Sequence, residues 1–342
     1  MHDTNAGTIT ASEPPSTPGS GRGRGRRLAA VLLGAALLAL TGLLGTVWLE
    51  RDAVRVPVLL YHNFTWEEHV PAASRYLTPR TVFAREMAYL AENGYTVIPL
   101  RQLIAHMETG APLPPRPVVL TFDDGYESNA TLAYPILKHH QFPATIFLVA
   151  SQDQSRAPAE PSMLSWTQMR QMEESGLIEI QAHTYDLHQL VATESAASPL
   201  RPAVLAPAWM PAAGRLETEA EYRSKLRTDF RQARETIERE LGHSPDILAW
   251  PYGAYSTTAL ELGREAGFRS FVTLRSGMNQ AGDSPLIIRR INVEGDLPVA
   301  EFAARLEPDR SLLRGLRQVL ARWLNRGLAV WTRPAAAAEE GR

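Results

Sequence analysis

The sequence predicts an α/β protein in which seven or eight mostly parallel strands alternate with helices, a number that favours a barrel over an open sheet. Short apolar runs rich in Val, Ile and Phe recur through residues 56–293, and helical patterns separate most of them. The runs predicted as strands are Val56–Tyr61, Thr96–Leu100, Val118–Phe122, Thr145–Val149, Ile178–Ala182, Ile247–Trp250, Ser270–Leu274 and Leu286–Val293.

Two of the helices have clear boundary residues. One is predicted to begin at Thr78, as N-cap, with Pro79 in the first helical position, and to end at Gly94. The other is the charged stretch Tyr222–Leu241, which Gly242 is expected to terminate. Residues 192–221 are rich in Ala and Pro and interrupt this alternation, so we expect a long surface insertion near the functional site.

Composition limits the possible chemistry. The 342 residues are 44% hydrophobic and 21% charged, which suffices for one sizeable core. A net charge of −2 gives no electrostatic reason to expect a nucleic-acid partner. The chain has no cysteine, which excludes disulfides, thiolate ligands and a cysteine nucleophile. Any metal must therefore be held by His, Asp or Glu.

The N-terminal region has the pattern of a membrane anchor. Residues 1–27 form a basic tail predicted to be disordered, and residues 28–49 are 22 residues without a charge, long enough to cross a bilayer core of about 30 Å. No Ala-x-Ala site follows, so an uncleaved anchor is favoured over a cleaved signal peptide. The arginines before the anchor predict a cytoplasmic N-terminus and an extracytoplasmic domain at residues 50–306, on a single-pass protein of the inner or cytoplasmic membrane.

The C-terminal region, residues 307–342, is basic. Residues 310–333 contain six arginines and no acid, with leucines and a tryptophan at helical spacing on one face. We favour a helix that packs on the barrel. The alternative is a basic amphipathic helix on anionic lipid or polymer.

Candidate catalytic residues follow four of the predicted strands. Asp123 and Asp124 end the strand in Thr121–Tyr126, where two carboxylates indicate either a functional site or a solvated turn. His183 and His188 follow Ile178–Ala182 and, with a carboxylate from another strand end, fit a metal site that has open positions for water and substrate.

Two further strand ends carry weaker patterns. His62 follows the first strand and could donate a proton near neutral pH. The run Pro251-Tyr252-Gly253 forms a sharp turn that could aim a backbone amide into a cleft. All four patterns lie at strand C-termini, so in a closed sheet they share one rim.

The runs TFDDGY, HTYDLH and WPYG, in this order and spacing, resemble the polysaccharide deacetylases (NodB-homology proteins, carbohydrate esterase family 4) over roughly residues 54–306. The resemblance implies a distorted (β/α)7-type barrel and a divalent metal, most commonly Zn²⁺, with Ni²⁺, Co²⁺ or Fe²⁺ as alternatives. It implies Asp123 as general base, the Tyr252 amide as oxyanion donor, and a metal held by Asp124, His183 and His188.

Three departures from the family pattern narrow the resemblance. The two histidines are five residues apart rather than four, apolar Leu248 and Ala249 stand where an arginine is usual, and no Leu-x-His segment follows near the C-terminus. These features resemble the branch of poly-β-1,6-N-acetylglucosamine deacetylases of biofilm matrices. That resemblance implies His62 as the acid, Arg290 as a site arginine, and possible partners in exopolysaccharide synthesis and export.

Several alternatives stay open. The substrate could be peptidoglycan or a chitin-like polymer, and the chain could be a membrane-tethered polysaccharide-binding module without activity. A glycosidase using Asp123 and Asp124 is disfavoured, because adjacent strand residues should point to opposite faces.

Overall fold

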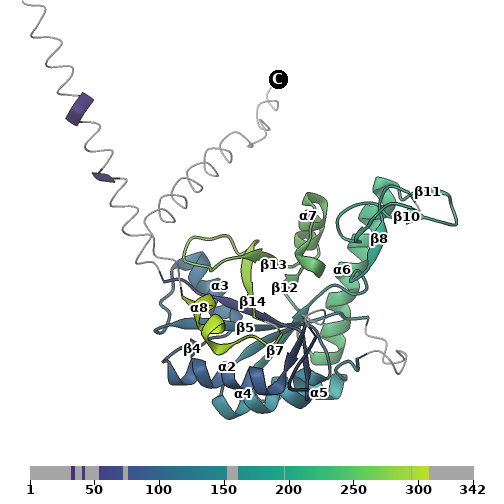
Figure 1. Ribbon diagram of the computed structural model, residues 1–342. Coiled ribbons are helices and arrows are strands. Elements are labelled where there is room, and N and C mark those ends of the chain that lie inside the picture. The colour runs from purple at the N-terminus through teal and green to yellow at the C-terminus, as the bar shows by residue number, and fades with distance from the viewer. Residues whose placement is uncertain are drawn as a thin grey trace, which may run out of the picture. The chain divides into compact units, whose positions relative to one another are not determined.

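The computed structural model in Figure 1 describes residues 32–34, 41–42, 54–71, 76–151, 161–195, 197–293 and 295–307. The chain divides into two units, and the unit Ala53–Asp309 contains the barrel described below. None of the described helices combines the length and the apolar character needed to cross a bilayer. The predicted tail 1–27, most of the predicted anchor 28–49 and the predicted helix in 310–333 lie outside the described residues.

Within the described residues, seven parallel strands close into a barrel, which agrees with the prediction (Figure 1). The order around the ring is β1-β14-β13-β12-β7-β6-β5, and β5 pairs back with β1. The short β4 (Thr96–Val97) lies outside this ring and pairs with the start of β5. The ring strands are β1 (Val58–Tyr61), β5 (Pro117–Asp124), β6 (Ala144–Leu148), β7 (Ile178–Ala182), β12 (Ile247–Ala249), β13 (Ser270–Ser276) and β14 (Ile288–Asn292).

Two separate apolar cores hold the barrel together. The larger core lies between the outward faces of the strands and the surrounding helices. The smaller core fills the interior, where Val58, Val119 and Ile247 meet Leu103 of α3 (Leu100–Thr109). Because these strand residues lie at or near the strand starts, α3 closes that end and leaves the opposite end for the site. The outer helices are α2 (Arg80–Glu92), α4 (Tyr134–His140), α5 (Trp166–Glu174), α6 (Glu219–Leu241), α7 (Thr257–Glu265) and α8 (Val299–Leu306).

One predicted helix boundary is wrong by one residue. Pro79, not Thr78, occupies the N-cap of α2. Thr78 belongs instead to β3 (Leu77–Pro79), which pairs with β2 (Asn63–Thr65), and its hydroxyl accepts a hydrogen bond from the Gly295 amide at 3.3 Å. This strand pairing competes with helical capping for the same residue, and the pairing decides its conformation.

Helix α6 ends at Gly242 as predicted but begins earlier, at Glu219. A capping box between Thr218 and Glu221 fixes this start, because each side chain binds the other's backbone amide. The predicted insertion at residues 192–221 consists largely of two small hairpins. They are β8 (Leu190–Ala192) with β9 (Leu200–Pro202), and β10 (Trp209–Met210) with β11 (Arg215–Leu216).

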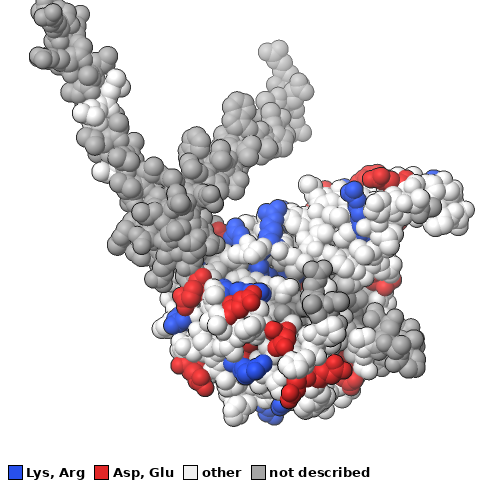
Figure 2. Space-filling view, in the orientation of Figure 1, with Lys and Arg blue, Asp and Glu red and all other residues white. Residues whose placement is uncertain are grey.

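The charged face of α6 is used in contacts with α7. Arg223 binds Glu261 at 2.8 Å, and Arg227 binds Glu265 at 3.3 Å. Solvent screens these exposed pairs, so each contributes little to stability. Figure 2 shows acidic and basic side chains interspersed on the visible face of the barrel unit.

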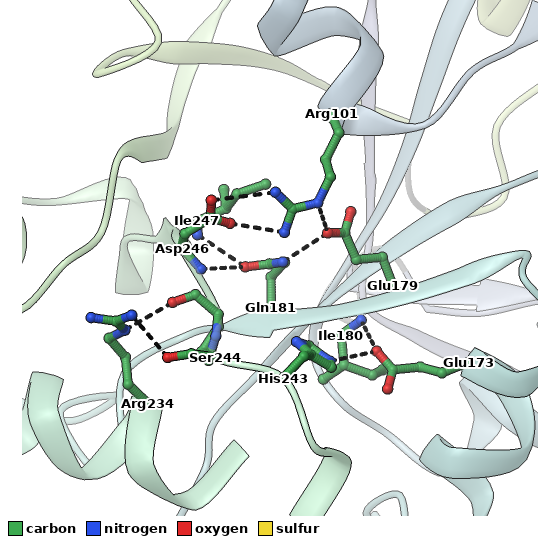
Figure 3. A network of polar contacts seen from close by, with 11 residues as sticks. Arg101, Glu173, Glu179, Ile180, Gln181, Arg234, His243, Ser244, Asp246 and Ile247 are labelled. Atoms are coloured by element: carbon green, nitrogen blue, oxygen red, sulfur yellow. Dashed lines mark hydrogen bonds and ion pairs between the residues drawn. The ribbon is translucent and has the colours of Figure 1, made fainter. Parts of the chain in front are cut away.

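The weakest point of the ring is the junction of β7 and β12, which pair at a single position, Leu248 with Ala182. Side chains complete this junction at the start of β12 (Figure 3). The side-chain Oε1 of Gln181 accepts hydrogen bonds from the backbone amides of Asp246 and Ile247 at 3.1 and 2.9 Å, so it replaces missing ladder bonds.

Arg101 of α3 then ties this junction to the helix that closes the barrel. Its guanidinium binds Asp246 at 2.8 Å and also binds Glu179 on β7 (Figure 3). The side-chain Nε2 of Gln181 donates to the same Glu179 carboxylate at 2.8 Å. The closure of the ring between β7 and β12 therefore depends on polar side chains as well as on backbone pairing.

A buried acid, Glu86 of α2, predicts a pH-dependent stability. The Tyr61 hydroxyl donates to its carboxylate at 2.9 Å. Burial raises the pKa of Glu86 from 4.5 to about 8, and the Tyr61 hydrogen bond and the charges of Arg305 and Arg85 offset this only in part. The unfolded chain loses this proton near pH 4.5, so stability should fall as the pH rises from about 4.5 to about 8.

Glu86→Gln should remove that fall, because the amide stays neutral and keeps a hydrogen-bonding group. We expect the free energy of unfolding at pH 8 to rise by on the order of 2–4 kcal/mol. Chemical denaturation from pH 5 to pH 9 measures this, with the exposed Glu92→Gln as control. Equal pH slopes for Glu86→Gln and the wild type would contradict the assignment.

Candidate active site

The structure brings the predicted site residues together at the end of the barrel where the strands finish. They form one connected set of side-chain contacts although they are far apart in the sequence. Asp123 and Asp124 end β5, His62 follows β1, His183 and His188 follow β7, Tyr252 follows β12, and Arg290 lies in β14. The rim predicted from the strand ends is therefore present.

Asp123 is held by a buried two-point ion pair. The Arg290 guanidinium donates to both carboxylate oxygens at 2.6 and 2.7 Å, and its Nε donates to the Thr273 carbonyl at 3.1 Å. Burial raises the pKa of Asp123, but the charge and the hydrogen bonds of Arg290 outweigh this effect and hold the pKa well below its usual range. Asp123 is therefore ionised at neutral pH.

The backbone at Asp124 departs from the strand conformation. Its φ is +71°, in the left-handed region that few residues other than glycine adopt. The expectation that the two adjacent carboxylates face opposite ways is consequently wrong. The His183 Nε2 atom lies 4.0 Å from the Asp123 Oδ2 and 3.5 Å from the Asp124 Oδ1, so both carboxylates border the same imidazole.

Asp124, His183 and His188 form a cluster that fits a metal ion. One ligand atom from each lies within 4.8 Å of the others, and the His188 Nε2 is 3.3 Å from the Asp124 Oδ1. Two imidazole nitrogens and one carboxylate suit Zn²⁺ and several other divalent transition metals, and three protein ligands leave a position for water or substrate.

The environment of His183 supports this role. Its Nδ1 lies 2.8 Å from the Ala249 carbonyl, an acceptor, so Nδ1 carries the hydrogen and Nε2 presents its lone pair to the cluster. Burial lowers the pKa of His183 to about 4, which the nearby carboxylates offset only in part. The imidazole is therefore neutral at physiological pH, as a metal ligand must be.

His62 also borders Asp123, with its Nε2 4.0 Å from the same Oδ2 that borders His183. Two neighbours that the sequence did not single out position it. Its ring packs on Tyr76 with centroids 5.0 Å apart, and its carbonyl accepts a hydrogen bond from the buried Asn129 side chain at 2.8 Å. Asn129 starts a π-helical turn, η2 (Asn129–Ala133), and such turns are frequent at functional sites.

The Tyr252 turn has a left-handed residue and a glycine in succession. Tyr252 has a φ of +56°, and its ring packs on His188 with centroids 4.6 Å apart. A Cβ on Gly253 would lie 2.6 Å from the Leu274 backbone nitrogen, so only glycine fits there. The role of the Tyr252 amide as an oxyanion donor stays a prediction.

Comparison with known proteins agrees with this geometry. The family described as "Polysaccharide deacetylase" matches residues 110–271. Poly-beta-1,6-N-acetyl-D-glucosamine N-deacetylase of Escherichia coli (strain K12) is 32% identical over 257 residues, which are 72% of this chain and 38% of that protein. The chain contains a polysaccharide deacetylase domain.

Solved structures support this polysaccharide deacetylase domain further. A de-N-acetylase from Aggregatibacter actinomycetemcomitans is 29% identical with a TM-score of 0.66, over 74% of this chain and all of that one. IcaB from Ammonifex degensii is 29% identical with a TM-score of 0.60, over 74% of this chain and 97% of that one. The chain spans 38% of the length of the Escherichia coli relative.

The cluster predicts that the deacetylase domain binds one Zn²⁺ per chain and that a chelator removes it. His188→Ala should weaken zinc binding by about 100-fold or more, since it deletes a ligand, whereas loss of a residue that only supports a ligand typically costs 10–100-fold. Elemental analysis and competition with a chromophoric chelator measure this. The exposed His139→Ala is the control, and a His188→Ala chain that binds zinc as tightly as wild type would rule the cluster out.

Proposed function

We propose that this deacetylase domain removes acetyl groups from an extracytoplasmic polysaccharide by metal-dependent amide hydrolysis, with poly-β-1,6-N-acetylglucosamine as the substrate. The observation that carries the proposal is the contact of three chemical groups at one rim. Asp123 supplies an ionised carboxylate. His62 and His183 each lie 4.0 Å from it, and His183 belongs to the cluster that fits a metal ion. The name of the Escherichia coli relative supports the same substrate.

Asp123 is assigned as the general base. Its carboxylate is ionised, and the two-point pair with Arg290 fixes its orientation, so it can accept a proton from a water molecule that attacks the acetamide carbon. A metal held by Asp124, His183 and His188 would lower the pKa of that water and polarise the acetamide carbonyl. Zn²⁺ is the proposed ion, with Ni²⁺, Co²⁺ and Fe²⁺ as alternatives.

His62 is assigned as the general acid. An imidazole can give a proton to the departing amine near neutral pH, which leaves glucosamine in the polymer and free acetate. The Tyr252 amide is assigned to the developing oxyanion, where loss of one such donor typically costs 10²–10³ in rate.

We also propose the cellular setting from the sequence. Residues 28–49 would anchor the chain in the cytoplasmic membrane and place the domain outside, close to proteins that synthesise or export the polymer. Cell fractionation and protease accessibility of the intact cell test this placement.

The reaction is tested on oligomers of N-acetylglucosamine with β-1,6 and β-1,4 linkages and on peptidoglycan fragments. We expect chelator-sensitive loss of 42 Da per acetyl group from the β-1,6 oligomers, measured by mass spectrometry. Asp123→Asn should bind zinc normally yet lose turnover. Preferential reaction of another polymer would overturn the substrate, and polymer binding that survives chelation without any deacetylation would favour a binding module.

Arg290 predicts the pH dependence of this reaction. The guanidinium holds the pKa of Asp123 below its usual range, so its removal should raise that pKa and move the acid limb of kcat/KM to higher pH. We expect Arg290→Met to show this shift together with a large loss of kcat. Its neighbour Arg289, which pairs with Asp283 at 2.8 Å, provides Arg289→Met as the matched control. An unchanged acid limb in Arg290→Met would contradict Asp123 as the base.

A further inference from the structure

Asp229 is a buried carboxylate outside the catalytic set. It lies on α6 between apolar residues of the same helix, Leu226 and Phe230, which pack into the outer core. The residue is 5% exposed. A carboxylate in such a place is costly unless hydrogen bonds compensate it, so its partners indicate what it does.

Those partners are successive backbone amides of one loop. The Tyr185 amide donates to Asp229 Oδ1 at 2.9 Å, and the Asp186 amide donates to Oδ2 at 2.7 Å. Consecutive amides that converge on one anion form a strong, directional site. These amides belong to the segment that joins His183 to His188.

The same loop is held from its other side by the end of β6. The His183 amide donates to the Leu148 carbonyl at 2.7 Å, and the Ala150 and Ser151 amides donate to the carbonyls of Thr184 and Tyr185 at 3.0 and 2.8 Å. These bonds fix the first half of the loop.

Thr184 makes the loop strained. Its φ is +71°, a backbone conformation that β-branched residues rarely adopt. The turn at Thr184 directs the following amides away from the barrel and toward α6. The second half of the loop, which leads to His188, is held by Asp229 and by Leu187, which packs in the outer core.

We propose that Asp229 is a positioning residue for the metal site. It holds the backbone of residues 185–186 so that His188 returns to within 3.3 Å of Asp124 despite the five-residue spacing from His183. This inference rests on the proposed metal site but not on the proposed substrate. Partners that orient metal ligands typically contribute 10–100-fold to metal affinity.

The test is zinc affinity of the full chain, measured by competition with a chromophoric chelator. Asp229→Asn keeps the size but leaves one acceptor oxygen and turns an NH₂ group toward backbone donors, so the zinc dissociation constant should rise about 10–100-fold. Phe230→Leu, on the same buried face of α6, is the matched control for simple loss of packing and should keep near wild-type affinity. Circular dichroism and thermal melting establish that each variant is folded.

Asp229→Glu provides a second variant that keeps the charge. The extra methylene displaces the carboxylate oxygens, so the zinc affinity of Asp229→Glu should lie between those of wild type and Asp229→Asn. If Asp229→Asn does not fold, Asp229→Glu tests the inference by itself. Wild-type affinity in Asp229→Asn or Asp229→Glu, or an equal loss in Phe230→Leu, would overturn the positioning role. A wild-type chain that binds no zinc would overturn the metal site and this inference together, whereas zinc binding without deacetylation would overturn only the proposed reaction.

Discussion

The buried pair between Asp123 and Arg290 is the interaction on which the active end of this barrel depends. It joins β5 to β14 across 167 residues of sequence and ties the rim to the Thr273 carbonyl of β13. Burying two charges is expensive, and excellent geometry with further hydrogen bonds is needed to compensate. Such a pair is poor evidence for stability, but it fixes the position and ionisation of the one carboxylate that borders both His62 and His183.

Backbone strain concentrates at the same rim. Among the described residues, the non-glycine positions with positive φ are Arg116, Asp124, Gln141, Thr184 and Tyr252, and the last two together with Asp124 lie at the site. Such conformations cost on the order of 1–3 kcal/mol each and persist only where the surroundings determine them. Here each one redirects the chain as it leaves a strand. The strain at Asp124 brings a second carboxylate to His183 that regular strand geometry would have sent to the opposite face.

Much of this architecture could be predicted from residue patterns. Apolar runs identified the strands because strands buried on both faces are nearly continuous in apolar residues. Strand C-termini identified the rim because parallel strands end on the same side. The predicted N-cap at Thr78 was wrong, because the pairing of β3 with β2 determines the conformation of this residue. The predicted side-chain direction at Asp124 was wrong, because its backbone leaves the regular strand conformation. Conformations of single residues depend on tertiary contacts that a local pattern does not contain.

The residues that support the site were harder to find for the same reason. Asn129 and Tyr76 contact His62 from segments without a recognisable pattern. Asp229 is recognisable by its position, because it interrupts the buried apolar stripe of α6 beside Phe230. A buried carboxylate is costly unless hydrogen bonds compensate it, so this position indicates a binding partner.

The two ends of the barrel are stabilised by different interactions. At the end where strands begin, apolar side chains and α3 exclude water, and the Gln181 network only completes the pairing of β7 with β12. At the other end, catalysis requires polar groups in fixed positions, and His62, His188 and Tyr252 lie beyond their strands, where strand pairing does not hold them. Side-chain hydrogen bonds contribute there: Arg290 fixes Asp123, and Asp229 holds the histidine loop. A rim built in this way is rigid where hydrogen bonds converge on it, which is the condition for a metal site whose ligands come from separate strands.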